Sequence, residues 1–486
     1  MPVSFGAPPA VYYLRFLPEI LLTGFAIVLM VLEPLTGARA KRYMGRIALV
    51  GLFGALAGAA WAGSQGGDAF FGMIVVDGFA SFFRILCIAA GILVVLASID
   101  FMRREAYESG EYYALVLFSI AGQSIMVSSN NLIVVFIGLE ISSIASYVLA
   151  GFLRGVKLAN EAATKYFLLG SFATAFLLYG IALIYGYTGT LYLGGIRDAL
   201  AGSRPGLLAG TAAALMFVGF AFKFSAAPFQ IWTPDVYQGA PSPISAFLAA
   251  GPKAAALAVF VRVFLTAFGP ITARWEPILW ASALATMVVG NFAALTQTNV
   301  KRLLAYSSIA HAGYIMVAIT AHSVVGTAAV MFYLAAYVAM NVGAFAVVTY
   351  FSRKGERYVL ITDYAGLGVR QPVVAALFSV FLLSLIGVPL TAGFFGKFYV
   401  FRAALASDLV WLTVLGLLNS AVSVYYYLRL LVVMYMHEPS EATENLPPVP
   451  FGLQAALWAS AAATLVLGIF PSPVLNYAVR AAEFFR

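Results

Sequence analysis

Apolar segments long enough to cross a membrane recur from one end of the chain to the other, and this feature decides the fold class. A helix needs roughly 20 mostly apolar residues to span the hydrocarbon core of a bilayer. In lipid, only helices and closed barrels satisfy all their backbone polar groups internally. About fourteen such segments occur, so the sequence predicts an all-α polytopic membrane protein. They lie near residues 12–32, 46–62, 75–98, 112–128, 131–152, 162–187, 207–230, 243–266, 277–297, 302–321, 324–351, 373–401, 408–436 and 452–473.

The composition excludes a soluble enzyme. Charged residues make up 10% of the chain and hydrophobic residues 62%, whereas soluble domains carry about 25% charged residues. The net charge of +8 comes from short loops, which favours a topology signal over nucleic-acid binding. The single cysteine, Cys87, excludes a disulfide framework and a cysteine-ligated iron–sulfur cluster within this chain. No phosphate-binding loop, dinucleotide-binding fingerprint or metal-ligand cluster occurs, so we expect no cofactor or metal ion on this chain.

Basic residues divide the loops into two classes. One class holds Arg39, Lys41, Arg42, Arg46, Arg103, Arg104, Arg154, Lys157, Lys301, Arg302, Arg353, Lys354, Arg357 and Arg370. The other class holds only Arg197, Arg204, Arg274 and Arg402. By the positive-inside rule the first class is cytoplasmic, which places both termini on the outer side. The N-terminus lacks a signal or transit peptide, which favours a bacterial cell (inner) membrane.

Two of the predicted spans contain helix breakers. The seventh contains Pro228 in "KFSAAPFQIW", and the twelfth contains Pro389 in "SLIGVPLTAGFFGKF". Broken helices survive in a membrane only where protein or a water-filled cavity covers the freed backbone groups. Paired breaks in two halves of a chain are typical of transporters built from inverted repeats. The breaks lie five spans apart, and because five is odd a repeat of that length must be inverted. The alternative is that both prolines are ordinary residues of membrane helices.

The repeats suggest how the chain is divided. We expect an N-terminal three-helix segment over 1–110, a first half-channel repeat over 111–266 and a second over 267–437. A C-terminal helix follows over 438–486.

Ionisable side chains at membrane depth are the candidate functional residues. Each costs roughly 2.5–3.5 kcal/mol to insert at the bilayer centre, so a functional role is the first hypothesis. Five lie deep within predicted spans, and a sixth, Lys165, lies near the start of its span and could reach the interface. The five deep residues are Glu140, Lys223, Lys253, His311 and Lys397. The alternative is that each lysine reaches the interface or forms an inert buried pair. We expect Arg262 and Arg429, near span ends, to reach the membrane surface.

The residue types suit a proton relay. Burial disfavours a charged lysine, whereas a nearby carboxylate stabilises it. If the carboxylate moves or takes up a proton, the lysine can release its own. Lysine changes its protonation readily when buried and arginine does not. A single deep histidine gives too few ligands for a bis-histidine haem. The sequence therefore predicts a chain of protonatable sites rather than a redox centre.

Two stretches carry a family resemblance. "FKFSAAPFQIWTPDVYQGAPSPISAFLAAGPKAA" and "TNVKRLLAYSSIAHAGYIM" resemble the antiporter-like membrane subunits of respiratory complex I and of multisubunit cation/proton antiporters. The "WTPDVYQGAP" loop, the chain length and a lysine at position 397 are similar to the N-type subunit of bacterial complex I. The resemblance covers essentially the whole chain. It implies a fourteen-helix core with two inverted five-helix repeats and one broken helix in each.

The resemblance also implies roles for the buried residues. In the family, a fifth-span glutamate, matching Glu140, pairs with the lysine of the broken seventh span, matching Lys223. An eighth-span lysine, matching Lys253, links the half-channels, and His311 and Lys397 continue the relay. Lys165 matches a sixth-span lysine of the N type. FMN, iron–sulfur clusters, NADH and quinone are then expected on other subunits, and NADH oxidation there would drive proton movement through this chain. Partners would be the other membrane subunits and, through them, the peripheral arm.

Other functions stay open on the sequence alone. A subunit of a multisubunit cation/proton antiporter, or of a membrane hydrogenase related to complex I, would use similar residues. A structural membrane spacer would use its buried charges only to fix helix packing. A self-contained solute carrier would need a substrate pocket.

Overall fold

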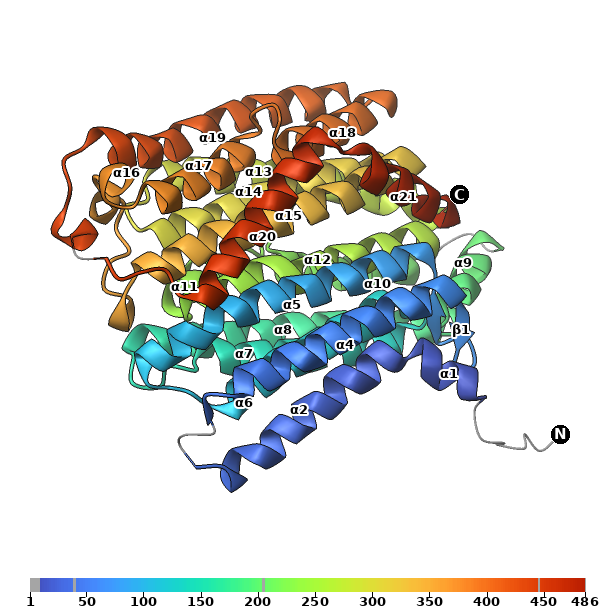
Figure 1. Ribbon diagram of the computed structural model, residues 1–486. Helices are drawn as coiled ribbons and strands as arrows, with labels where there is room; N and C mark the ends of the chain where they lie inside the picture. The colour runs from blue at the N-terminus through green and yellow to red at the C-terminus, as the bar shows by residue number, and fades with distance from the viewer. Residues whose placement is uncertain (1–8, 38–40, 203–205, 445, 486) are drawn as a thin grey trace.

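The structure, a computed structural model, describes residues 9–37, 41–202, 206–444 and 446–485. It is a bundle of helices that run roughly along one direction, with one small β-hairpin at an end (Figure 1). The predicted all-α polytopic fold is confirmed. The hairpin pairs β1 (Gly67–Ala69) with β2 (Ile74–Val76) in antiparallel register.

The helices of the first half of the chain are α1 Ala10–Arg15, α2 Leu17–Leu35, α4 Met44–Gln65, α5 Gly78–Glu105, α6 Gly110–Val127, α7 Leu132–Ala150, α8 Lys157–Thr188, α9 Leu193–Ala201, α10 Leu207–Phe224, α11 Thr233–Gly239 and α12 Ser242–Thr266. Those of the second half are α13 Thr272–Leu295, α14 Val300–Thr320, α15 Val324–Phe351, α16 Leu367–Arg370, α17 Pro372–Ile386, α18 Ala392–Ala406, α19 Val410–Met436, α20 Phe451–Ile469 and α21 Ser472–Ala482. Short 3₁₀ turns are η1 Gly269–Ile271, η2 Lys354–Glu356, η3 Ile361–Tyr364, η4 Glu441–Thr443 and η5 Glu483–Phe485.

Among the described residues, 12 helices are long and apolar enough to cross a membrane. The two remaining predicted spans are α6 and the α17–α18 pair. The first backbone N–H groups of a helix have no partner within the helix, and polar side chains at several helix starts accept hydrogen bonds from them. Asn131 accepts from the N–H of Ile133 at the start of α7, and Ser323 accepts from that of Gly326 at the start of α15.

Both broken helices are present. The first break separates α10 from α11 and contains Pro228, and the second separates α17 from α18 and contains Pro389. Gly387 ends α17 with φ 95°, a left-handed conformation that glycine adopts without steric cost. Each break falls in the fourth span of its predicted repeat, and the repeat boundaries themselves stay a prediction.

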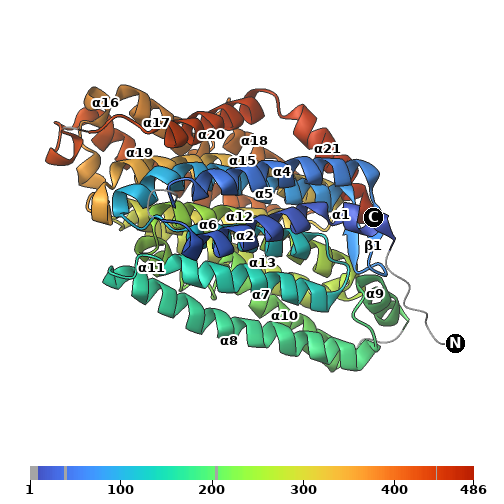
Figure 2. The same ribbon diagram turned by 60° about the horizontal axis from the view of Figure 1, so that its bottom comes forward.

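Three helices form the centre of the bundle. In α12, every residue of the most apolar 18-residue stretch is buried, and α14 and α15 are 94% buried by the same measure. A helix that is apolar on all sides belongs in an interior. Figure 2 shows α8 and α10 on one side of the bundle and α17 and α20 on the opposite side. The central helices carry Lys253 and His311.

The basic loops gather at one end of the bundle. Arg104, at the end of α5, donates to the carbonyls of Thr349 and Tyr350 at the end of α15. The loop after α15 returns to α5, because the N–H of Gly355 donates to the Glu105 carboxylate. We call this the basic end; α1 and α21 lie at the opposite end (Figure 1). Arg39 and Arg204, which the topology prediction uses, lie outside the described residues.

Two arginines sit in buried ion pairs near the opposite end. Arg84 and Glu19 are 2.8 Å apart with fully buried side chains. Arg262 lies 2.8 Å from Asp77 and is 1% exposed, so the prediction that it reaches the membrane surface was wrong. Asp77, at the start of α5, provides the counter-charge that makes burial of this guanidinium tolerable. Arg429, the other arginine of that prediction, donates to the Leu295 carbonyl at the end of α13.

Candidate functional site

Lys223 lies on the last turn of α10, directly before the first break, and is 4% exposed. Its ammonium donates to the Ser143 hydroxyl at 2.8 Å and to the Tyr166 hydroxyl at 3.2 Å. Ser143 belongs to α7 and Tyr166 to α8. The ammonium also lies 5.5 Å from the centre of the Tyr166 ring, within the range of a cation–π contact. Neutral groups from two neighbouring helices therefore hold this buried cation.

Glu140 does not form the direct ion pair with Lys223 that the resemblance implies. Among the ion pairs of the described residues, none joins these two side chains, although the Glu140 charge acts on Lys223 through space. The physical reason is position on α7: Ser143 lies almost one helical turn beyond Glu140 and takes the hydrogen bond. One Glu140 oxygen, Oε1, is buried without a hydrogen-bond partner. Ile137 and Ile144, on the same helix, are 48% and 56% exposed, so Glu140 lies at the lateral surface.

Side chains cover the backbone groups that the first break exposes. The Trp232 indole N–H donates to the Phe222 carbonyl at 2.9 Å. Trp232 also stacks on Tyr166 with ring centres 4.4 Å apart. Ser225, with φ 67°, accepts a hydrogen bond from the Thr233 hydroxyl. The break is thus satisfied within the protein, as a membrane interior requires.

Lys253 occupies the centre of the bundle on α12 and is 1% exposed. Its ammonium donates to the Ser308 carbonyl at 3.1 Å and to the Ser308 hydroxyl. The hydroxyls of Tyr237 and Tyr337 are buried without a hydrogen-bond partner. Ser308 lies three residues before His311 on α14, on the same helical face.

His311 uses both ring nitrogens. Nδ1 lies 2.8 Å from the Tyr333 hydroxyl, and Nε2 lies 3.3 Å from the Tyr427 hydroxyl. The Tyr427 hydroxyl also bonds the hydroxyl of Ser307. Because a tyrosine hydroxyl donates and accepts, this arrangement fits either tautomer of the imidazole. His311 is therefore placed to take a proton on one side and release one on the other.

Lys397 lies on α18, after the second break. Its ammonium donates to the Ile386 carbonyl at 2.7 Å and to the Ser420 hydroxyl at 2.8 Å. It also lies 5.0 Å from the centre of the Tyr314 ring, on the same helix as His311. A cavity of about 470 Å³ borders this lysine, with Phe398 and Leu417 in its wall. Both wall residues are about half exposed, so the cavity opens to the lateral surface.

We call Lys223, Lys253, His311 and Lys397, with their hydroxyl partners, the polar axis. Within the described ranges, no carboxylate forms an ion pair with any of the three lysines. A carboxylate would favour the ammonium form only. A hydroxyl can accept from an ammonium and donate to a neutral amine, so it serves both protonation states. The axis is suited to transferring protons rather than to storing fixed charge.

Several other buried polar atoms along the helices lack a hydrogen-bond partner. They are Glu140 Oε1, Gln123 Oε1, the hydroxyls of Tyr237 and Tyr337, and both amide atoms of Asn341. Leaving one such group unsatisfied costs roughly 1–3 kcal/mol. Buried polar groups of this kind are normally satisfied by internal water. Internal water beside these atoms would satisfy them.

Lys165 stands apart from the axis. Its side chain is 41% exposed and pairs with Glu161 at 2.7 Å and Asp235 at 2.6 Å. Arg302 binds the other oxygen of Asp235. The structure thus does not bring Lys165 together with the buried lysines, because two carboxylates hold it at the protein surface. Its predicted part in the relay gains no support from this position.

Sequence reasoning found the lysines and the histidine but missed their partners. Ser143, Ser308 and Ser420 are short polar residues within apolar helices, where such residues are common. Their positions show a weak signal: Ser143 follows Glu140 by three residues, and Ser308 precedes His311 by three. That spacing places side chains on one helical face. Among the described residues, no group of three or more His, Cys, Asp or Glu side chains could hold a metal ion.

The chain matches one family model and is similar over almost its full length to a protein of known family. A family model described as NADH:quinone oxidoreductase/Mrp antiporter, TM, matches residues 129–423. NADH-quinone oxidoreductase subunit N 1 of Solibacter usitatus is 60% identical over 483 residues, covering 99% of each chain.

Two solved structures are also similar. A chain of respiratory complex I from Thermus thermophilus with bound aureothin is 38% identical, with a TM-score of 0.81 over 94% of this chain and 98% of that one. A chain of the membrane-bound sulfane sulfur reductase, an archaeal respiratory membrane complex, is 26% identical, with a TM-score of 0.84 over 97% of each chain.

Proposed function

Because the chain belongs to the N subunits of NADH-quinone oxidoreductase, within the NADH:quinone oxidoreductase/Mrp antiporter family of membrane proteins, we propose that it moves protons across the membrane as one subunit of such an assembly. The polar axis carries the protons. The observation that supports this most strongly is the nature of its contacts: buried lysines held by hydroxyls and carbonyls, without a fixed counter-ion. A spacer that used charge only to fix packing would pair its lysines with carboxylates.

The relay runs from the first break to the second. Lys223 passes a proton toward Lys253 through hydrated space near Tyr166 and Tyr237. Ser308 connects Lys253 with His311, and the tyrosines around His311 lead to Lys397. Each residue loses and regains a proton, so none is consumed.

Glu140 acts as the control element. Its charge stabilises the Lys223 ammonium through space, and its neutralisation removes that stabilisation. Electron transfer from NADH to quinone on other subunits, which hold FMN and the iron–sulfur clusters, provides the energy that changes this charge. The lateral position of Glu140 suits such control, because a neighbouring membrane subunit packed on α7 can reach it.

The orientation follows from the charge asymmetry. We place the basic end on the cytoplasmic side of a bacterial inner membrane and the opposite end, with α1 and α21, on the outer side. Neighbouring membrane subunits cover the lateral faces, and the peripheral arm is reached through them.

A purification from the native membrane tests the assignment. The chain is tagged, extracted gently, and the particle is measured for mass and for NADH:quinone activity, then placed in liposomes for proton translocation. We expect a large particle that oxidises NADH and acidifies the liposomes, and loss of that acidification in Lys223→Ala. A particle of membrane subunits without NADH activity would instead support the antiporter or the hydrogenase-like alternative. Full acidification by assembled Lys223→Ala would refute the relay.

A further inference from the structure

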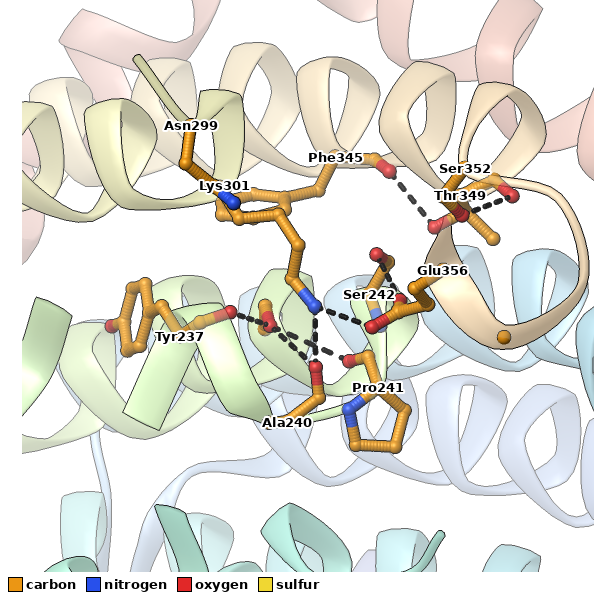
Figure 3. Close-up of polar contacts among 12 residues, drawn as sticks. Tyr237, Ala240, Pro241, Ser242, Asn299, Lys301, Phe345, Thr349, Ser352 and Glu356 are labelled. Atoms are coloured by element: carbon orange, nitrogen blue, oxygen red, sulfur yellow. Dashed lines mark hydrogen bonds and ion pairs between the residues drawn. The ribbon is translucent and has the colours of Figure 1, made fainter. Parts of the chain in front are cut away.

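A buried ion pair also lies at the basic end, away from the polar axis. Lys301, near the start of α14, is 2.7 Å from Glu356 in η2 and donates to the Ala240 carbonyl at 2.6 Å (Figure 3). The second Glu356 oxygen accepts from the backbone N–H of Ser242 at 2.7 Å and from the Ser242 hydroxyl. The pair therefore clamps residues 240–242, where α11 of the broken helix meets α12.

The Glu356 carboxylate stands where α12 has no side-chain cap of its own. Pro241 occupies the N-cap position and has no side chain that can accept from the first helical N–H groups. An anion at a helix N-terminus also interacts favourably with the helix dipole. Lys301 in turn satisfies the Ala240 carbonyl just beyond the end of α11. Both charges are thus fixed by backbone groups of the segment that leads to Lys253.

The two partners differ in access to water. The side chain of Lys301 is 1% exposed, whereas that of Glu356 is 14% exposed. Glu356 therefore contacts both the solvent at the basic end and the buried Lys301 ammonium. If Glu356 takes up a proton, the Lys301 ammonium loses its counter-charge in a buried site, which is strongly unfavourable. The clamp is stable only while Glu356 is ionised.

The loop that holds Glu356 has a strained backbone. Arg353 has φ 55° and Glu356 has φ 51°, which are left-handed conformations that residues with side chains rarely adopt. Such strain persists only where surrounding contacts hold it, and it clusters at functional sites. The contacts here are the Glu356 clamp and the hydrogen bonds from Gly355 to Glu105. Release of the clamp would let the loop relax.

Polar groups lead inward from the clamp to the polar axis. Lys301 and Ser308, the partner of Lys253, lie seven residues apart on α14, a rise of about 10 Å. The Tyr237 ring lies with its centre 6.3 Å from that of Phe345 on α15, and Asn341 lies one turn before Phe345 on the same helix. The Tyr237 hydroxyl and the Asn341 amide are the buried groups without partners that indicate internal water.

We propose that Glu356 is the residue that takes up protons at the basic end, with Lys301 as its counter-charge, and that its protonation opens the hydrated path to Lys253. The proton comes from water at the basic end, binds a Glu356 oxygen, and leaves inward to Lys253 after that residue has released its own. Loss of the proton restores the clamp. This inference rests on the proposed proton relay and adds an inlet that joins it at Lys253.

Charged and titratable groups from several packed elements surround Glu356. Lys301 from α14, Arg104 from α5, Tyr112 from α6 and Tyr364 from η3 interact with its charge, Glu105 from α5 binds the neighbouring Gly355 N–H, and Arg353, Lys354 and Arg357 belong to its own loop. Of these, Lys301 alone forms an ion pair with Glu356 among the described residues. The Lys301 ammonium is therefore the group that loses its counter-charge when Glu356 gains a proton.

Two substitutions at one position separate proton uptake from a structural role. Glu356→Gln keeps length and a hydrogen-bond acceptor for Ser242 but cannot be protonated. Glu356→Asp keeps the titratable group on a shorter side chain that cannot span both partners. For proton uptake, we expect Glu356→Gln to lower the number of protons translocated per NADH below the wild-type value, and Glu356→Asp to lose less. A clamp that is only structural is broken by both substitutions, because Gln removes the counter-charge of Lys301 and Asp is too short, and assembly then falls together with translocation.

The measurement uses the purified assembly in liposomes, with electron transfer and assembly recorded for each variant. Glu438→Gln is the matched control, because it removes an exposed carboxylate in the loop after α19. The reverse order, or a wild-type yield in Glu356→Gln, overturns the proposal. If Glu356→Gln does not assemble, the pH dependence of translocation in Glu356→Asp decides: a pH profile shifted from that of the wild type supports the proposal, and an unchanged profile overturns it. Lys223→Ala distinguishes failure of the proton relay from failure of the Glu356 inlet. If Lys223→Ala stops translocation while Glu356→Gln does not, only the inlet is wrong.

Discussion

Replacing Tyr427 by phenylalanine removes a single hydroxyl from the second half of the polar axis. That hydroxyl lies 3.3 Å from Nε2 of His311 and also bonds Ser307. His311 is 2% exposed and Ser307 is fully buried, so bulk water cannot replace the lost partner. The substitution keeps the aromatic ring and hence most of the packing.

The cost follows from the two groups left without this partner. A buried donor or acceptor that loses its partner costs roughly 1–3 kcal/mol. If that cost falls on the state in which His311 carries the proton, the transfer step slows, because the phenol oxygen no longer accepts from the imidazole N–H. Each 1.36 kcal/mol is tenfold in rate, so the step slows by about 5- to 150-fold.

The assay is NADH-driven acidification of liposomes that contain the purified assembly. We expect the rate of acidification per assembled particle to fall about fivefold or more in Tyr427→Phe. The control is Thr464→Val, which removes an equally buried hydroxyl, bonded to the Ser460 carbonyl at 2.8 Å, on a helix that carries no member of the polar axis. A wild-type rate in assembled Tyr427→Phe would refute the role of His311 as a relay between Lys253 and Lys397.

Three further substitutions test other parts of the structure. In Gly393→Ala the new methyl carbon would lie 1.8 Å from the Ser384 carbonyl oxygen, so the second break must shift at a cost of about 1–3 kcal/mol; thermal unfolding of the assembly should begin at a lower temperature. Arg84→Ala leaves Glu19 buried and unpaired, which costs about 3–5 kcal/mol, and we expect much less chain in membranes by immunoblot. Lys165→Ala removes an exposed ion pair, and we expect proton translocation to change by less than twofold; a loss like that of Lys223→Ala would return Lys165 to the relay.

The spans and breaks could be predicted because each depends on local sequence. Apolar runs of membrane-spanning length have one stable state in lipid, and proline removes a helical hydrogen bond wherever it occurs. The buried lysines could be found for the same reason, since a charge within an apolar run is visible without knowledge of its neighbours.

Partners could not be predicted, because they depend on contacts between distant segments. The sequence places Lys301 in a cytoplasmic loop, yet its side chain is buried, because Ala240 and Glu356, 61 and 55 residues away, satisfy it. Arg262 is buried for a similar reason, since Asp77 meets it from a position 185 residues away. Glu140 shows the opposite case. Its expected partner was Lys223, but Ser143, on the same helix as Glu140, accepts the hydrogen bond from Lys223 instead.

Lys253 joins the two halves of the polar axis, so its replacement tests the central claim most directly. The measurement is the number of protons translocated per NADH oxidised by the assembled Lys253→Met complex in liposomes, at matched rates of electron transfer. Methionine keeps much of the side-chain volume but cannot carry a proton. The relay predicts a lower number of protons per NADH than in the wild-type complex. An unchanged number in a fully assembled complex would contradict it, because protons would then be crossing without the residue that links the two halves.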